Sequence, residues 1–476
     1  MRLAKYSLAV LLALVVTGCR VGPKYARPVV ATPAGYRGLA PSVNQTTIPA
    51  RTFGDEKWAD VFQDPTLKQL IQEALANNYD IRIAAQRVLE QQDVVGITRS
   101  QQFPTIAAGG SYTAVGVPNS LLGALNSNGS QKGGESLFYA GGITLSAAWN
   151  LDFWGLYRSQ TEAARAQLVA TEWGRRMVIS TIVENVATAY IQLRTLDAEL
   201  EITRRTLDAR KESLKLTEAL EQGGSATLAD VRQAEELQYT AAAAIPEIER
   251  QTQQVENGLS ILLGRNPGPI VRDAAPMNWP APDQIPAGLP SQLLERRPDI
   301  QQAEAELIAA NANVGVARAQ LFPQLSLSAQ GGTFSSQAKA LVDSKSMFWT
   351  ASGNLTQAIF DAGRLRNNVR LSEAQKQEQI LTYQQTIRQA LRSVSDALIG
   401  VQKYREYREE QGRVTTAAED ATRLARLRYS AGSTNYLEVL TNDTNYYNAQ
   451  LNLAVAQEQE AVSIVQLYSA LGGGWQ

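Results

Sequence analysis

The chain contains the same pattern twice. Three glycines of the first half recur in the second half at one constant spacing. The pairs are Gly155 and Gly363, Gly224 and Gly432, and Gly264 and Gly472. Further upstream, Phe103-Pro104 recurs as Phe322-Pro323 at a larger spacing, so the first half has a short insertion between Pro104 and Gly155. A period of about 200 is too long for a solenoid repeat. The sequence therefore predicts a fold built from two copies of one structural half.

Composition argues against several classes of function. The 476 residues include no histidine and one cysteine, Cys19. This argues against histidine-based acid–base catalysis, His/Cys metal sites and an internal disulfide. The sequence contains no Gly-x-x-x-x-Gly-Lys phosphate loop, and its net charge of −1 gives no electrostatic basis for binding nucleic acid. We therefore expect no enzyme activity, no catalytic residues, no cofactor, no metal site and no nucleic-acid partner.

Residues 1–18 have the pattern of a signal peptide. Basic residues precede an apolar run, Leu8 to Val16, that is too short to span a bilayer. The run ends in Val16-Thr17-Gly18-Cys19, which resembles a bacterial lipobox and implies cleavage before Cys19 and acylation of that residue. Two or more acyl chains give stable anchoring. Arg20 follows in place of aspartate, which favours the outer membrane. The alternative is a plain secretory signal with an unrelated cysteine.

The segment 19–64 is rich in proline. Its prolines are Pro23, Pro28, Pro33, Pro41 and Pro49. Because proline fixes φ and lacks an N–H donor, we expect an extended, lipidated segment that wraps the rest of the fold, in place of a separate domain.

Four windows contain no Asp, Glu, Lys or Arg. They are residues 103–131, 136–151, 319–338 and 346–360. Within them apolar and uncharged polar residues alternate with a period of two, as in Leu325-Ser326-Leu327-Ser328-Ala329, which predicts β-strands. The expected strands span about 103–116, 138–151, 323–334 and 347–360. Aromatic residues mark the strand ends, as they do in membrane β-strands with one face toward lipid and one toward a polar lumen.

Two readings of these strands remain open. They are either membrane-spanning strands or soluble hairpins with one buried face. The absence of charged residues on the polar face favours membrane-spanning strands. Four strands are too few to close a barrel, and an open edge in lipid leaves backbone groups unpaired. If the strands span a membrane, the chain must therefore oligomerise.

The rest of the sequence predicts helix. Two hairpins, 155–264 and 363–472, each contain an outward helix of 69 positions without proline, reaching roughly 100 Å. A Gly-Ser tip then reverses the chain into a shorter return helix. Helices of this length must bury their apolar positions against neighbours, as in a coiled coil. With the upstream helical segments, the first repeat covers 65–264 and the second 299–476. A Pro-rich linker, 265–298, connects them.

Several motifs in this order resemble the outer-membrane factor (TolC-type) channels. The resemblance is closest to lipoprotein members that serve resistance-nodulation-division pumps, and it covers essentially all of the mature chain. The motifs are Cys19-Arg20-Val21-Gly22-Pro23-Lys24-Tyr25-Ala26-Arg27-Pro28, Arg296-Arg297-Pro298-Asp299-Ile300, Leu321-Phe322-Pro323, Phe360-Asp361-Ala362-Gly363, Arg428-Tyr429-Ser430-Ala431-Gly432 and Tyr436-Leu437-Glu438-Val439-Leu440.

The resemblance implies a mixed membrane β-barrel and α-helical barrel that closes only as a homotrimer. Three chains would supply twelve strands in the lipid bilayer and a tunnel of twelve helical columns in the periplasm. The implied function is a passive, gated exit duct of a tripartite efflux system, with a periplasmic adaptor protein and an inner-membrane pump as partners. Alternatives are the exit duct of a protein-secretion system and a lipid-anchored periplasmic coiled-coil scaffold. The four methionines form no cluster that indicates a metal cargo.

The resemblance also assigns roles to residues at the tips. Asp230 and Tyr429 are expected to form a polar link of the gate, Leu437 to line its apolar constriction, and Glu438 to face the lumen. The adaptor is expected to dock at the two tips. These tip residues are Gly224, Ser225, Gly432 and Ser433. The family usually has an aspartate directly after the Leu440 position. This chain has Thr441 there and Asp443 two residues later, so the acidic ring is displaced or absent.

Overall fold

The computed structural model describes residues 21–33, 35–38, 52–119, 135–272, 286 and 288–475. The expected signal peptide and Cys19 lie outside these residues. The chain divides into two compact units. The first consists of residues 1–28, 90–169 and 305–381, and the second of residues 29–89, 170–304 and 382–476. Each unit takes segments from both halves of the duplicated sequence.

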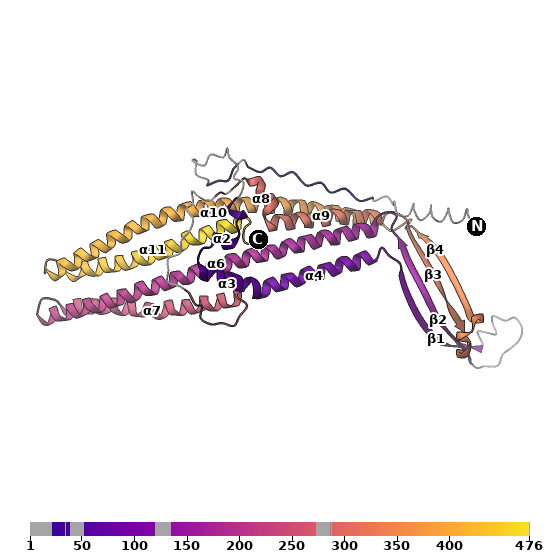
Figure 1. Cartoon of the computed structure of the whole chain (residues 1–476), viewed down its shortest axis with the longest axis horizontal. Helices are drawn as coiled ribbons and strands as arrows, with labels where there is room; N and C mark the ends of the chain where they lie inside the picture. The colour runs from indigo at the N-terminus through magenta and orange to yellow at the C-terminus, as the bar shows by residue number, and fades with distance from the viewer. Residues whose placement is uncertain are drawn as a thin grey trace. The chain divides into compact units, whose positions relative to one another are not determined.

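The first unit contains an antiparallel sheet of four strands in the order β1-β2-β3-β4. The strands are β1 (Thr105–Pro118), β2 (Glu135–Leu151), β3 (Gln324–Ser335) and β4 (Met347–Thr356). Each half of the chain contributes one hairpin, and β2 pairs with β3 to join the two (Figure 1). In the described chain β1 and β4 are therefore edge strands, and each has one unpaired side.

The pairing register collects the apolar residues of all four strands on one face. Residues paired directly across strands share a face. Trp149 pairs with Leu327, and Leu325 pairs with Leu355. On the opposite face Ser146 pairs with Gln330. That face is uncharged and polar except at the end of the sheet that holds three aromatic residues. These are Phe138, Phe334 and Phe348.

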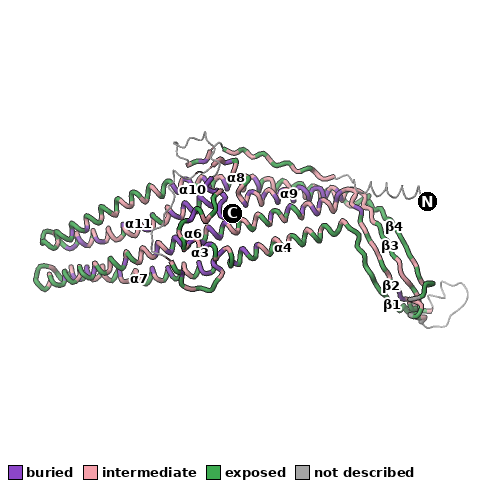
Figure 2. Tube along the Cα trace, viewed as in Figure 1, coloured by how far each residue is buried: buried purple, intermediate pink, exposed green. Residues whose placement is uncertain are grey.

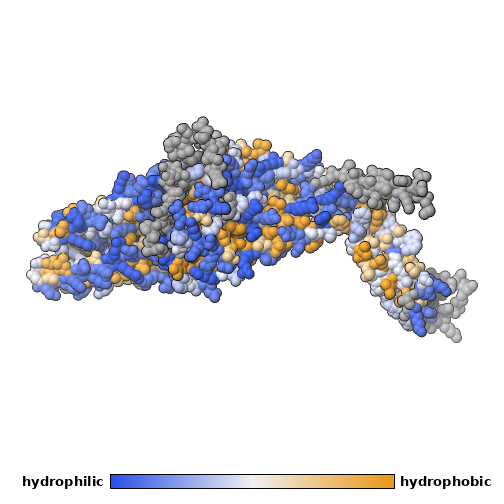
Figure 3. All heavy atoms as spheres, viewed as in Figure 1, coloured by the Kyte–Doolittle hydropathy of each residue, from blue (hydrophilic) through white to orange (hydrophobic). Residues whose placement is uncertain are grey.

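The described part of the chain covers neither face of this sheet. Large apolar side chains remain exposed, among them Trp349 at 81% and Leu355 at 69% (Figures 2 and 3). The polar residues of β4 between them are exposed as well. None of the helices in the described ranges is long and apolar enough to cross a bilayer. The exposed sheet therefore lacks the covering layer that a soluble sheet has on its apolar face.

Strand boundaries differ by a few residues from the expected ones. β1 and β3 begin after Pro104 and Pro323, because proline cannot donate to the ladder. β4 ends at Thr356, four residues before the expected end at Phe360. Thr356 pairs with Gln324, the first residue of β3, so residues 357–360 have no partner in β3.

Two hairpins of very long helices account for most of the remaining residues. The first consists of α6 (Leu156–Gln222) and α7 (Leu228–Leu262), and the second of α10 (Arg364–Ser430) and α11 (Tyr436–Ala470). Both outward helices contain 67 residues and both return helices contain 35. In Figure 1, α7 lies beside α6 and α11 beside α10. The duplication is thus preserved to the residue in helix length.

The repeated glycines end these helices in the same way. Gly224, Gly264, Gly432 and Gly472 all have a positive φ, between 69° and 86°. At each one the residue after the glycine donates its N–H to the carbonyl five residues back, as Ser225 does to Leu220 at 2.8 Å and Ser433 to Arg428 at 2.9 Å. This is the Schellman arrangement, which satisfies orphan carbonyls at a helix end and favours glycine. The constant spacing of the repeated glycines therefore reflects repeated helix ends.

Five shorter α-helices complete the two halves among the described residues. They are α2 (Trp58–Val61), α3 (Pro65–Asn77), α4 (Tyr79–Ser100), α8 (Pro290–Arg296) and α9 (Pro298–Ala319). The break between α3 and α4 is held by Asn78, whose side chain accepts N–H groups of Asp80 and Ile81 and donates to the carbonyl of Leu262 at 2.8 Å. The expected linker 265–298 is not wholly irregular, because α8 forms within it with Pro290 at the first helical position.

The second unit has its densest packing around three fully buried tyrosines, Tyr190, Tyr383 and Tyr468. The ring of Tyr468 meets Phe53 and Phe62 edge to face, with centroids 5.4 and 6.0 Å apart. Such pairs add about 0.5–1.5 kcal/mol beyond burial of area. This packing fixes the ends of the return helices.

The glycine pairs give a test of this packing. Gly224 and Gly264 have nearly the same φ, 73° and 75°. A Cβ at Gly224 would meet no atom within 4 Å, whereas one at Gly264 would lie 2.4 Å from the carbonyl oxygen of Asn77. We expect Gly224→Ala to cost about 1–2 kcal/mol of unfolding free energy from backbone strain, and Gly264→Ala distinctly more. Urea unfolding of the detergent-solubilised protein measures both. Equal losses would contradict the clash.

Candidate functional site

The two hairpin tips are open loops that expose backbone and hydroxyl groups. Gly224, Ser225, Gly432 and Ser433 are all exposed. A Cβ at either glycine would meet no atom within 4 Å. The hydroxyl of Ser433 donates to the carbonyl of Arg428 at 2.9 Å. The expected docking residues are therefore rigid in backbone conformation and accessible in the single chain.

Asp230 caps the return helix of the first hairpin. Its carboxylate accepts both the N–H and the hydroxyl of Thr227, each at 2.8 Å, and the Thr227 hydroxyl accepts the N–H of Asp230. This capping box satisfies N–H groups that the start of a helix leaves unpaired. In the second hairpin Asn435 accepts the N–H of Glu438 in the corresponding position.

Tyr429 packs at the tip against another aromatic ring. Its ring lies edge to face against Tyr436, with centroids 5.3 Å apart. Its hydroxyl is buried and makes no hydrogen bond of normal geometry to a described residue, although the Thr217 hydroxyl lies near it. Burial raises the pKa of Tyr429, the contact with Thr217 lowers it, and the charge of Asp230 raises it. Among the described residues the carboxylate of Asp230 binds Thr227 through one oxygen, and its link to Tyr429 stays a prediction.

Leu437 and Glu438 both lie on the first turn of α11. Leu437 is 55% exposed, so its apolar side chain is uncovered in the single chain. Glu438 is paired, since its carboxylate accepts a hydrogen bond from Arg428 at 2.7 Å and another from the hydroxyl of Thr434. The acidic position is therefore neutralised across the tip by an arginine of the outward helix.

Asp443 lies two residues beyond the position where the family usually has an aspartate. Its side chain is 8% exposed and forms ion pairs with Arg210 and Arg426. Asp443 is therefore not a free carboxylate on a lumen surface. Its role stayed open at the level of the sequence, where its two arginine partners were not identified.

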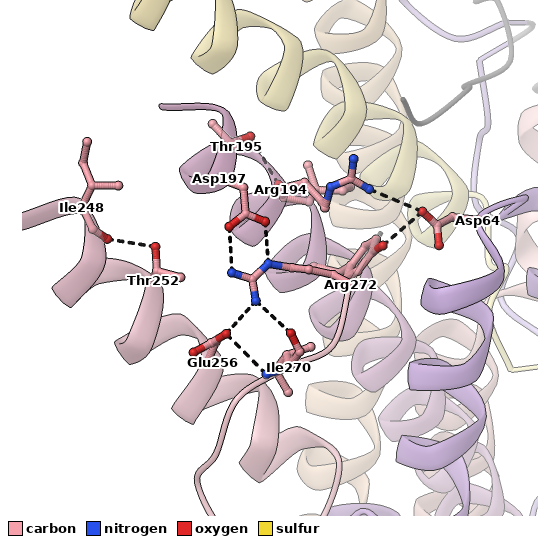
Figure 4. Close-up of polar contacts among 11 residues, drawn as sticks. Asp64, Arg194, Thr195, Asp197, Ile248, Thr252, Glu256, Ile270 and Arg272 are labelled. Carbon is pink, nitrogen blue, oxygen red and sulfur yellow. Dashed lines mark hydrogen bonds and ion pairs between the residues drawn. The ribbon is translucent and has the colours of Figure 1, made fainter. Parts of the chain in front are cut away.

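A second group of charges, also not identified from the sequence, fixes the chain after α7 (Figure 4). The guanidinium of Arg272 binds both carboxylate oxygens of Asp197, at 2.5 and 2.7 Å, and one oxygen of Glu256 at 2.6 Å. It also donates to the carbonyl of Ile270. These two hydrogen-bonded carboxylates raise the pKa of Arg272. In the sequence, the one sign of this cluster is the arginine at position 272, near the start of the Pro-rich linker.

The segment that follows Cys19 lies on the first unit. The N–H of Val21 faces the carbonyl of Trp154 at 3.5 Å, and Asn311 donates to the carbonyl of Pro23 at 3.0 Å. A Cβ at Gly315 would lie 3.2 Å from the Cα of Gly22. The extended segment is thus held against α9 and the junction between β2 and α6.

Residues 70–265 and 289–473 match the family model described as outer membrane efflux protein. The chain belongs to the outer membrane efflux protein family. As a member of this family it is an outer-membrane efflux channel. The two matched stretches correspond to the two halves of the duplicated fold.

Relatives match over nearly the full length. The solvent efflux pump outer membrane protein SrpC of Pseudomonas putida is 35% identical over 477 residues, covering 98% of each chain. The cation efflux system protein CusC of Escherichia coli O6:H1 (strain CFT073) is 32% identical over 464 residues, covering 98% of this chain and 97% of CusC.

A solved structure shares the fold. The open state of the Neisseria gonorrhoeae MtrE outer membrane channel superimposes with a TM-score of 0.82 at 29% identity, covering 96% of this chain and 99% of MtrE. The two relatives are named for different cargoes, solvents and cations.

The Arg272 cluster predicts a stability difference. Arg272→Ala leaves Glu256, which is 13% exposed, without its cation. We expect a loss of about 2 kcal/mol in the free energy of unfolding. Arg250→Ala is the matched control, because Arg250 pairs with Glu247 on the exposed surface of α7 and should give no measurable change. Chemical unfolding of both variants measures this. Similar losses for the two would contradict the role of the cluster.

Proposed function

We propose that three copies of this chain form a lipid-anchored exit duct for small toxic compounds. Each chain contributes four strands to a twelve-stranded barrel in the outer membrane and four helical columns to a periplasmic tunnel. An inner-membrane pump supplies the energy, and a periplasmic adaptor protein joins the pump to the tips. The chain itself is passive, since its sequence contains no nucleotide-binding loop.

The observation that carries this proposal is the uncovered sheet. Its apolar face exposes Ile143, Leu145, Trp349 and Leu355, each by more than half. Its other face is polar and carries no charge through most of its length. Lipid matches the first face and a water-filled lumen matches the second. The free edges of β1 and β4 then pair with neighbouring copies, because unpaired backbone groups in lipid cost several kcal/mol each.

The helices next to the edge strands support the same assembly. α4 leads into β1 and exposes Ile83, Val94 and Ile97, with Ile97 at 65%. α10 follows β4 and exposes Leu371 and Leu381, at 56% and 58%. An apolar stripe on a long helix needs a partner helix. In the trimer these two helices of adjacent chains cover one another.

Lipidation of Cys19 fits the placement of the next residues. Val21 and Pro23 are held by Trp154 and Asn311 next to the sheet. Acyl chains on Cys19, two residues before Val21, would therefore enter the bilayer that surrounds the barrel. The anchor and the strands would then share one membrane.

We assign the gate and the adaptor contact to the hairpin tips. Gly224, Ser225, Gly432 and Ser433 present an accessible surface of fixed conformation to helical hairpins of the adaptor. Near them, Tyr429 and Leu437 narrow the closed lumen, with Asp230 and Glu438 as its acidic groups. The edge-to-face contact of Tyr429 with Tyr436 and the exposure of Leu437 at the tip support this assignment.

Measurements of ion conductance test whether the protein forms an open duct. The purified protein in planar bilayers should form channels of low conductance, because the tips are closed. Asp230→Ala removes the charge beside Tyr429, and Tyr429→Ala removes the ring packed on Tyr436, so each should raise the conductance several-fold. Tyr239→Ala, on an exposed position of α7 away from the tip, serves as the control and should leave it unchanged. Absence of current from every variant would contradict a duct.

Cys19→Ser tests the anchor separately. We expect fewer assembled channels, because the acyl chains no longer concentrate the chains at the membrane. The assembled protein should stay in the outer-membrane fraction, since the barrel itself is embedded. Membrane fractionation and mass spectrometry of the mature N-terminus measure both effects. A soluble monomer would mean that the lipid alone held the chain and that the strands do not span the bilayer.

A further inference from the structure

The four long helices of one chain meet at a single buried ion cluster near the tips. Asp443 on α11 accepts the Nε–H of Arg210, on α6, at 2.9 Å. Its other oxygen accepts a hydrogen bond from Arg426, on α10, at 2.6 Å. Arg210 also donates to the carbonyl of Leu237, on α7, at 2.9 Å. One carboxylate and one guanidinium thus connect all four helices of the two hairpins.

The central pair is closed off from solvent. The side chains of Arg210 and Asp443 are 3% and 8% exposed, whereas Arg426 is 44% exposed. The guanidinium of Arg210 also lies over the ring of Tyr447, 5.1 Å from its centroid. A buried ion pair adds little net stability over an apolar pair of the same size, yet removing one partner leaves a costly unpaired charge. Such a pair specifies one arrangement of the helices.

Polar contacts continue along the same seam. On α6 the positions seven residues before and after Arg210 are Thr203 and Thr217, both with 0% exposure. The hydroxyl of Thr203 lies 3.0 Å from that of Tyr447 on α11. The apolar cluster nearby is small. Its buried members are Ala234, Ala425, Tyr436 and Val439. The register of the two hairpins in this stretch therefore depends on directional polar contacts as well as on this small apolar cluster.

We propose that Asp443 and Arg210, with Arg426, are positioning residues of the gate. They lock α10 and α11 against α6 and α7, and so hold Tyr429 and Leu437, which lie about one to two turns from Arg426 and Asp443 on the same helices, in the closed arrangement. Hydrogen bonds and ion pairs can exchange for water when the hairpins separate, at less cost than exposing an apolar seam. Release of this lock lets the second hairpin move relative to the first. The lock between the hairpins is argued from contacts within one chain, and only its expected effect on conductance rests on the proposed function.

The test reads hairpin separation directly. Spin labels at Gln222→Cys and Ser430→Cys mark the exposed ends of α6 and α10. The unmodified chain, whose single native cysteine is Cys19, is labelled in parallel to measure that background. Asp443→Asn keeps the shape of the side chain and leaves Arg210 without its counter-charge. We expect the label distances to shift or broaden and the channel conductance to rise several-fold, with a lower melting temperature, because Arg210 is left as a buried unpaired charge.

Asp420→Asn is the matched control. Asp420 pairs with Arg423 on the same helix as Arg426, but both side chains are 60% exposed. It should leave distances and conductance unchanged. Adding Arg210→Gln to Asp443→Asn removes the buried unpaired charge without restoring the ion pair. We therefore expect the melting temperature to recover toward the parent value, while distances and conductance stay changed. A purely structural role would instead return the melting temperature, the distances and the conductance together.

Each outcome decides the proposal. If Asp443→Asn gives the same distances as Asp420→Asn, the lock does not exist. If Asp443→Asn fails to assemble, Arg426→Gln replaces it, because that partly exposed arginine can be removed while Arg210 still pairs with Asp443. It should produce a smaller change in the same direction, and no change would overturn the proposal. If the distances between the spin labels change but no variant conducts ions, the ion cluster still locks the hairpins and the proposed duct is contradicted.

Discussion

The four-stranded sheet of each chain has two edges whose backbone groups need partners outside the chain. A strand in lipid must satisfy every backbone N–H and C=O group within protein. In one chain β1 and β4 leave a row of these groups free. The apolar face of the sheet is uncovered as well. The sheet is therefore complete only in an assembly of several chains.

Packing changes along the helices of the second unit. Around Tyr190, Tyr383 and Tyr468 the side chains are large and fully buried, and Arg272 adds a network of charged hydrogen bonds. Toward the tips the hairpins meet through a small apolar cluster that includes Tyr436 and through buried polar contacts. Regions with few buried apolar contacts open at lower free energy than densely packed ones. This difference in packing is the basis for placing the gate at the tips.

Much of this fold could be predicted from the sequence, because its signals are local. The period of two in charge-free windows predicted all four strands, and the glycines repeated at a constant spacing predicted four helix ends with the same geometry. Strand ends were harder, since the end of β4 at Thr356 depends on its partner Gln324. The helix α8 was missed because Pro-rich composition dominates its surroundings.

The candidate site was less predictable. Asp443 and Arg210 are far apart in the sequence, within stretches that have the charge content of a solvated helix surface. Their burial depends on which faces of α6 and α11 meet, and the seven-residue spacing of Thr203, Arg210 and Thr217 was the one local sign of it. Likewise, the capping box in which Asp230 binds Thr227 was not foreseen. The link between Asp230 and Tyr429 stays a prediction.

Electron cryo-microscopy of the protein in lipid nanodiscs can show whether copies of this chain close one another's sheets. We expect a three-fold symmetric particle in which β1 of each chain is hydrogen-bonded to β4 of the next. A monomeric particle, or an oligomer in which β1 and β4 remain unpaired in contact with lipid, would contradict it.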